Sequence, residues 1–193
     1  MSTTKPPSLR MSPNSNIDTI ITNTRRWLEQ VVIGLNLCPF ARAVYVKNQV
    51  RIVVSSARHI DAFLDDLDRE LAHLQAVSAE ETDTTLLVHA TLFPDFMVFN
   101  DFQGVVDEVL LEHSLEGVIQ VAHFHPDFVF DGEPEGDMSH FTNRAPYPIL
   151  HLLREDSVAC AIHSAGGDAD AIVARNIRTL RELGPEGWER LLG

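Results

Sequence analysis

The central stretch of the chain reads GVIQVAHFHPDFVFDGEPEGDMSHFTNRAPYPILHLLRE over residues 117–155. It opens with an apolar alternation over 118–124 that predicts a β-strand. Side chains two residues apart share a face of a strand, so His123 and His125 are expected to point the same way. Pro126 cannot donate to a sheet and should end the strand. Both imidazoles would then lie at its carboxyl end, where open α/β sheets bind ligands.

These two histidines are the first candidates for a metal site. Imidazoles at i and i+2 of one strand can chelate a single ion. Asp127, in the acidic run that follows, could add an oxygen ligand. The alternative is a pair of strand-end histidines beside a solvated acidic loop, because an HxH pattern occurs in many proteins without a metal.

The second half of the stretch begins with NRAPYP at residues 143–148. Proline is tolerated in a first helical turn and Asn143 is a good N-cap, so the pattern predicts a short helix up to Glu155. A helix start beside Arg144 would favour an anion. His151 would share a helix face with Tyr147. The alternatives are an ion pair of Arg144 with the acidic loop and a half-buried, hydrogen-bonded His151.

Length and composition set outer limits on the function. The chain has 193 residues, of which 45% are hydrophobic, and this fits a single soluble domain over residues 16–193. Residues 1–15 should form a flexible tail, in which Met11 is an alternative start. The sequence lacks a secretory signal and an apolar run of membrane-spanning length. A net charge of −13 argues against nucleic acid as a partner. Two cysteines, Cys38 and Cys160, favour reduced thiols and a cytoplasmic location. The oligomeric state stays open.

The remaining patterns predict strands and helices that alternate through the middle of the chain. The fold class we predict is α/β (or α+β), a single-domain sandwich of a four-stranded mixed sheet with helices packed on it. The expected helices are 17–37, 59–76, one capped by Asn100 or Asp101, 157–164, and one from about 168 to 183. The expected strands, besides 118–124, are 43–46 and 50–55, joined as a hairpin, and 84–92.

Cys38 stands where the first helix should end, because Pro39 excludes the residue before it from helical geometry. A carboxyl end of a helix and apolar neighbours both raise a thiol pKa. Cys38 would therefore need a histidine, an arginine or a metal beside it to react. The alternative is a buried structural cysteine.

Several motifs resemble a bacterial family known as domain of unknown function 1415, over about residues 24–192. They are WLEQVVIGLNLCPFA (27–41), DTTLLVH (83–89), FHP (124–126), TNRAPYP (142–148), LHLLRE (150–155) and RNI (175–177). The family implies no activity. Its pattern commonly has other polar residues at His123 and His140. The polar residues that match it are Asn36, Cys38, His89, His125, Asn143, Arg144 and His151.

Three functions are compatible with these residues. The first is an enzyme acting on a small anionic metabolite, with Cys38, His125, His151 and Asn143 in catalysis and Asn36, Arg144 and Tyr147 on the substrate. The second is a zinc or iron protein whose ligands would come from Cys38, His89, His125 or His151, with His123 or Asp127 as supplements. The third is a non-catalytic protein that binds a small molecule or a partner.

Overall fold

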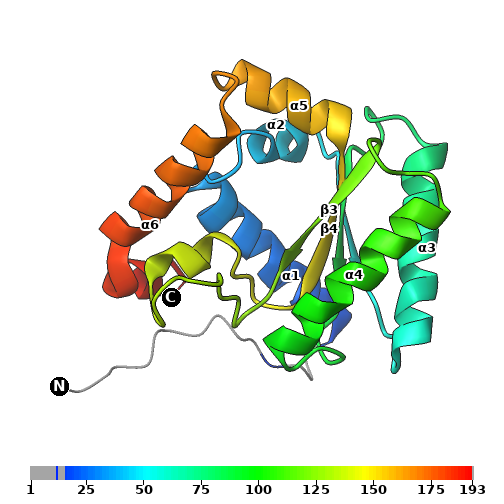
Figure 1. The fold of residues 1–193 in the computed structure, drawn as a ribbon, viewed down its shortest axis with the longest axis horizontal. Helices are drawn as coiled ribbons and strands as arrows, with labels where there is room; N and C mark the ends of the chain where they lie inside the picture. Colours follow the sequence, from blue (N-terminus) through cyan, green and yellow to red (C-terminus); the bar gives the residue numbers. More distant parts are fainter. Residues whose placement is uncertain (1–11, 13–15, 193) are drawn as a thin grey trace.

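A mixed sheet runs through the molecule in the order β1-β2-β4-β3 (Figure 1). The computed structural model describes residues 12 and 16–192. The strands are β1 (Val50–Val54), β2 (Thr84–Val88), β3 (Ile119–Phe124) and β4 (Ile149–Arg154). β1 and β2 are parallel, whereas β4 is antiparallel to both of its neighbours, β2 and β3. The predicted fold class is confirmed: this part of the chain is a single α/β domain with six α-helices and a four-stranded open sheet.

Helices cover both faces of the sheet. The α-helices are α1 (Ile17–Trp27), α2 (Ala41–Val46), α3 (Ile60–Ala76), α4 (Phe96–Glu112), α5 (Glu155–Ser164) and α6 (Ala169–Leu192). A π-helical segment, η1 (Leu28–Ile33), continues α1, and a short 3-10 helix, η2 (Met138–Thr142), precedes β4. α3 and α4 lie together on one face, and α1, α2, α5 and α6 lie on the other (Figure 1). Among the described helices, none combines the length and the apolar character needed to cross a bilayer.

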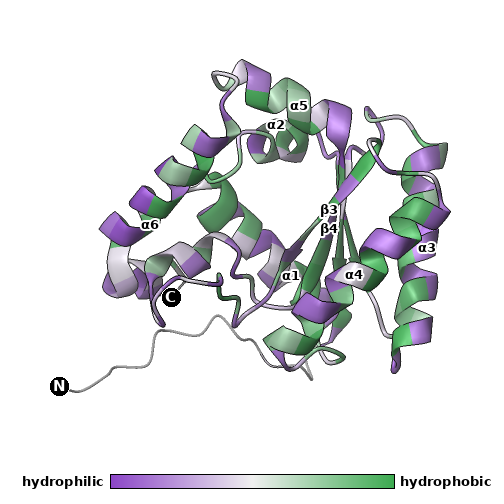
Figure 2. Cartoon of the chain, in the orientation of Figure 1, coloured by the Kyte–Doolittle hydropathy of each residue, from purple (hydrophilic) through white to green (hydrophobic). Residues whose placement is uncertain are grey.

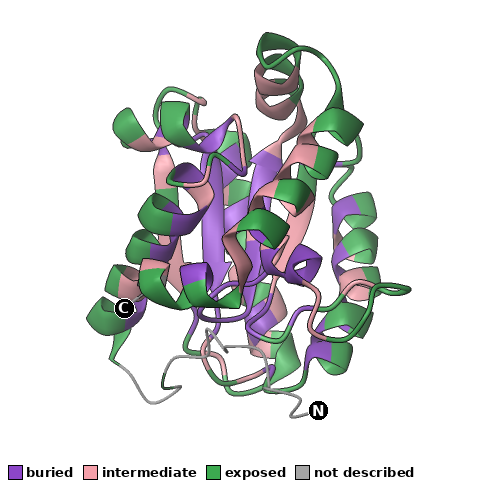
Figure 3. Cartoon of the chain, turned by 90° about the vertical axis from the view of Figure 1, so that its left-hand side faces the viewer, coloured by how far each residue is buried: buried purple, intermediate pink, exposed green. Residues whose placement is uncertain are grey.

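The alternation of side chains along the strands divides the core in two. Leu87, Leu150 and Leu152 point toward α3 and α4, where they join a cluster rich in phenylalanine. Leu86 and Ile149 point the other way, into the cluster built on α1 and η1. The inner strands are buried and hydrophobic, whereas the helices expose their outer sides (Figures 2 and 3).

The helix predicted from Asn143 to Glu155 is wrong. Residues 149–154 form the inner strand β4, in which His151 is paired with Leu86 on one side and with Ala122 on the other. A strand that bonds to both neighbours satisfies all of its backbone groups, and this outweighs the weak local signals of a capping asparagine and two prolines. α5 begins only at Glu155.

The hairpin predicted from strands 43–46 and 50–55 is also wrong. Residues 41–46 form α2, and Asn48 adopts a left-handed conformation (φ 57°) in the turn that leads into β1. β1 then pairs in parallel with β2 and forms the edge of the sheet, because the segment before it is a helix and not a second strand. Of the predicted domain bounds, the tail at 1–15 lies outside the described residues except for Ser12.

Candidate functional site

Two adjoining cavities lie on the sheet face covered by α1, α2, α5 and α6. The smaller has a volume of about 280 Å³ and lies between β3, β4, α5 and the start of α6. The larger, of about 580 Å³, extends toward η2 and the acidic loop before it. They share a wall of six residues: Val32, Leu37, Cys38, Ala122, Phe124 and Val173. Because the wall is common to both, we treat them as one joined cavity.

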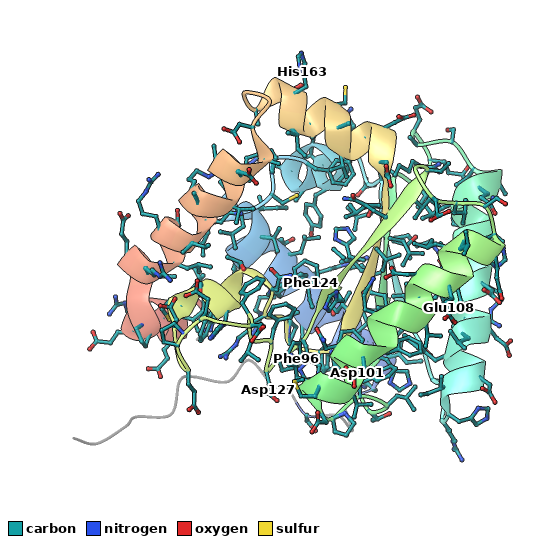
Figure 4. All side chains as sticks on the ribbon, in the orientation of Figure 1. Phe96, Asp101, Glu108, Phe124, Asp127 and His163 are labelled. Carbon is teal, nitrogen blue, oxygen red and sulfur yellow. The ribbon has the colours of Figure 1, made fainter. Side chains whose placement is uncertain are left out.

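The strand β3 sets which side chains reach this cavity. Gln120, Ala122 and Phe124 line the smaller cavity. Phe124, labelled in Figure 4, lies between β3 and α1, where its ring meets that of Trp27 edge-on with 5.3 Å between centroids. His123 lies on the opposite face and contacts the ring of Phe99 in α4. The predicted alternation of β3 is therefore right, and it sends the histidines away from the cavity.

Cys38 stands at the junction of the two cavities, in the turn between η1 and α2. The turn begins at Asn36, which has a left-handed backbone (φ 53°) and whose carbonyl accepts a hydrogen bond from Arg175 at 2.7 Å. Burial raises the pKa of the Cys38 thiol, and hydrogen bonds from the backbone amides of Phe40 and Ala41 oppose this effect only in part. The thiol is therefore protonated at neutral pH.

His151 reaches the same cavity from β4. Its Nε2 lies 2.8 Å from the hydroxyl of Thr84, and that hydroxyl lies 2.6 Å from the carbonyl oxygen of Leu152. A carbonyl only accepts, so the hydroxyl donates to Leu152 and accepts from His151. Nε2 therefore carries the proton and Nδ1 keeps its lone pair. The contact with Thr84 is the ring's only hydrogen bond in the described part of the chain.

Burial makes this ring hard to charge. Desolvation lowers the pKa of His151 to about 4, so the imidazole is neutral at physiological pH. Cys38 and His151 line the smaller cavity together. Within the described residues no hydrogen bond joins them, and each is neutral in its own environment.

The other predicted catalytic histidine, His125, lies on the α4 face instead. Its ring sits 5.6 Å from those of Phe96 and Phe99. Nε2 lies 3.0 Å from the carbonyl of Phe93, and Nδ1 accepts from the amide of Asp127 at 3.0 Å. The structure thus separates His125 from Cys38 by the thickness of the sheet, and gives it the role of holding two loops.

His89, at the end of β2, is likewise bound to backbone groups through both ring nitrogens. Its Nε2 lies 2.8 Å from the carbonyl of Ala57, and its Nδ1 accepts from the amide of Leu92 at 2.8 Å. His123 differs, because its Nε2 is buried without a hydrogen-bond partner among the described residues. Burial lowers the pKa of both rings.

The residues proposed as metal ligands therefore do not form a ligand set. In residues 16–192, no three side chains of His, Cys, Asp or Glu lie close enough together to hold an ion. The two histidines at strand ends, His89 and His125, use both ring nitrogens on backbone groups. Cys38 lies on the other face of the sheet from His123 and His125.

Two of the residues proposed to bind the substrate, Arg144 and Tyr147, are buried and contact other parts of the fold. Arg144 is 6% exposed, stacks on the ring of Phe141 at 4.1 Å and donates from Nε to the carbonyl of Phe128 at 3.2 Å. The buried Tyr147 accepts a hydrogen bond from Asn23 at 2.9 Å. Neither lines the joined cavity, and no helix begins beside Arg144. The helix start from which the sequence predicted an anion site at Arg144 is therefore not formed.

Asn143 lines the larger cavity, and two residues that were not predicted from the sequence also line the joined cavity. Asn176, in α6, reaches the same space and donates to the carbonyl of Leu37 at 2.6 Å. Gln120 lines the smaller cavity. Asn176 belongs to the RNI motif at 175–177, and this motif could have identified it from the sequence. The alternation of β3 could likewise have placed Gln120 on the same strand face as Ala122 and Phe124.

Comparisons with known proteins place the whole domain in one family. No curated protein and no solved structure matches the chain. A family model described as "Protein of unknown function (DUF1415)" matches residues 19–190, which is nearly all of the folded part. The chain therefore belongs to the DUF1415 family of proteins of unknown function.

Proposed function

We propose that this protein binds a small, largely apolar molecule in the joined cavity, with the polar end of the molecule between Cys38 and His151. One observation carries the proposal: a preformed hollow that is lined mainly by aliphatic and aromatic side chains and holds a few convergent polar groups. Ligand sites in proteins commonly have this character. The apolar walls supply affinity, and the polar groups fix the orientation of the ligand.

The charges around the cavity favour a neutral ligand over the anionic one expected from the sequence. Among the described residues, no lysine or arginine lines the joined cavity, whereas Asp131 and Glu133 line its larger part. An anion in this space would lose its hydration without gaining a cation. The free lone pair of His151 Nδ1 suits a ligand that donates a hydrogen bond, such as an alcohol.

An enzyme centred on Cys38 is the second candidate, and the shared cavity of Cys38 and His151 favours it. A thiol nucleophile needs a partner that takes its proton. Here burial raises the pKa of the thiol and lowers the pKa of the imidazole to about 4, so a thiolate–imidazolium pair is disfavoured. Binding without thiol chemistry is the better supported reading. A Cys38→Ser variant that still binds the ligand would agree with it.

The two cysteines allow a direct test, because one lies in the joined cavity and the other outside it. Alkylation by iodoacetamide, followed site by site with mass spectrometry, reports the access to each thiol. We expect 1-octanol to slow the alkylation of Cys38 saturably and to leave Cys160 unchanged. Octanoate, with the same chain and a negative charge, should protect Cys38 at least about tenfold less well.

A matched pair of variants locates the effect. Ala122 lines both parts of the cavity, so Ala122→Leu should fill it and abolish protection by octanol. Ala72, exposed on α3 across the sheet, provides the control: Ala72→Leu should protect like the wild type. Equal protection in Ala122→Leu and the wild type, or stronger protection by octanoate than by octanol, would contradict the proposal.

A further inference from the structure

A buried carboxylate at the start of β2 lacks the partner that its position calls for. Asp83 is 8% exposed, and its Oδ1 is buried with no hydrogen-bond partner in the described part of the chain. No ion pair between described residues includes it. Removing a carboxylate from water is costly unless a cation or donors replace the lost hydration. A buried oxygen of this kind points to a missing partner.

This carboxylate lies in a second hollow, a groove that shares only Pro39, Phe40 and Ala161 with the smaller cavity. The groove has a volume of about 540 Å³ and lies between α2 and α5. Besides Asp83, its polar residues are Lys47, Gln49, Ser157, Cys160 and Ser164. Neither Cys38 nor His151 lines it. The groove is therefore a second hollow with a different chemistry, in which one buried negative charge is the dominant feature.

The backbone around Asp83 holds the carboxylate in place. Its amide donates to the carbonyl of Gln49 at 2.9 Å, which fixes the start of β2 against the start of β1. The side chain of Gln49, which also lines the groove, donates from Nε2 to the carbonyl of Glu80 at 3.2 Å. Asp83 and Gln49 thus line one side of the groove, and Ser157 and Ser164 of α5 line the other.

We propose that this groove is a binding site for a small organic cation, a molecule with an ammonium or guanidinium group held by Asp83. An N–H donor with a positive charge satisfies the buried carboxylate by a charge-assisted hydrogen bond, and Gln49 and Ser157 can accept the remaining donors. A bare metal ion fits less well, because among the described residues Asp83 belongs to no group of three or more His, Cys, Asp or Glu side chains that could hold one.

Lys47 is the protein's own alternative partner and needs to be distinguished from a ligand. It lies at the end of α2, is exposed, and makes no ion pair with Asp83 in the described structure. Lys47 is exposed, whereas Asp83 is buried. In this arrangement Lys47 weakens the attraction for a cationic ligand, so replacing it gives an informative variant.

Cys160 lies exposed in this groove and reports its occupation. The test measures alkylation of Cys160 by iodoacetamide at pH 7 and constant ionic strength, with n-butylammonium as the probe. We expect n-butylammonium to slow the alkylation of Cys160 saturably and at least about threefold, whereas butyrate and 1-butanol have no effect. Cys38 in the same molecule should keep its rate.

Two variants test the role of the carboxylate. Asp83→Asn should abolish the protection while leaving the thermal midpoint equal to or above that of the wild type, because it removes an unpaired buried charge. Lys47→Glu, at an exposed position, should strengthen the protection at least about twofold. A lower midpoint of Asp83→Asn would assign the carboxylate a structural role and overturn the proposal.

Other outcomes would overturn it as well. Protection that survives in Asp83→Asn, protection by butyrate or butanol equal to that by n-butylammonium, or a Lys47→Glu variant no better than the wild type would each exclude a cation site at Asp83. Since the reporter and the probe differ from those used for the joined cavity, either proposal can fail while the other stands.

Discussion

His151 links the stability of the protein to pH. Burial lowers its pKa to about 4, whereas an unfolded histidine titrates near 6.5. The unfolded state therefore binds the proton more readily. The contribution of the neutral ring to the free energy of unfolding is fully present above about pH 6.5, and it is lost progressively as the pH falls through 4. At low pH the loss amounts to about 3 kcal/mol.

Urea unfolding of the wild type and of His151→Gln at pH 7.5, 6, 5 and 4.5 measures this contribution. A glutamine amide can replace Nε2–H as donor to Thr84, but it does not titrate. We expect the difference in unfolding free energy between the two proteins to shift in favour of His151→Gln as the pH falls. If this difference did not change with pH, the ring would take up its proton in the folded protein as readily as in the unfolded protein.

Cys38 should react slowly for a partly accessible thiol. Since burial raises its pKa, the thiolate fraction at pH 7.5 is smaller than that of a free cysteine. We expect the rate of alkylation by iodoacetamide to rise with pH through a midpoint above that of free cysteine. Site-resolved mass spectrometry between pH 6 and 10.5 measures it. A midpoint below about 8 would revive the nucleophile hypothesis.

At the scale of elements, α6 is held against η2 by an aromatic contact more than by its ion pairs. Trp188 is 1% exposed and meets the ring of Phe141 edge-on, with 4.9 Å between centroids. Trp188→Ala should therefore lower the unfolding free energy by about 3–5 kcal/mol. Arg181 reaches Asp137 and Glu133 at 3.0 Å each, but its side chain is 48% exposed.

Arg181→Met serves as the comparison for Trp188→Ala. Exposed ion pairs contribute little, so this variant should unfold at nearly the denaturant concentration of the wild type, and the small difference should shrink in 0.5 M salt. The pKa of Asp137, which Arg181 holds at about 2, should rise toward its ordinary value. If Arg181→Met were the more destabilising of the two, electrostatic docking would be the main contribution.

The elements that could be predicted from sequence are those whose own pattern determines them. β3 alternates and ends at a proline, and α3 carries an uninterrupted apolar stripe, so both agree with the structure. The segment 149–154 carries no such alternation, because an inner strand is apolar on both faces. Its conformation depends on pairing with β2 and β3, which lie far away in the sequence, whereas the local capping residue and the prolines favoured a helix.

The site residues were likewise placed correctly only where the local sequence pattern was sufficient. Cys38, His151 and Asn143 reach the joined cavity, as a shared site requires, whereas His125 and Arg144 do not. The alternation of β3 correctly grouped His125 with His123. It could not tell which helices cover that face, and α4 rather than α1 does so. Placement of Arg144 failed because it assumed a helix where β4 begins.

For the molecule as a whole, stability is concentrated in the sheet and falls off toward one wall of the joined cavity. All five residues of β2 are buried, and none of α5 is. Regions with little buried apolar surface open without global unfolding. α5 supplies Val158 and Ile162 to the lining, so its opening would admit a ligand without disturbing β3 or β4.

Hydrogen–deuterium exchange tests this gradient. We expect the amides of α5 to exchange at least about ten times faster than those of β2 and β4, since opening α5 exposes little apolar surface. Saturating 1-octanol should slow exchange in α5 and leave α3, on the other face of the sheet, unchanged. The Ala122→Leu variant should show no such slowing. Protection of α5 equal to that of β4 would mean that the wall opens only with the whole domain, and the ligand would then need another entrance.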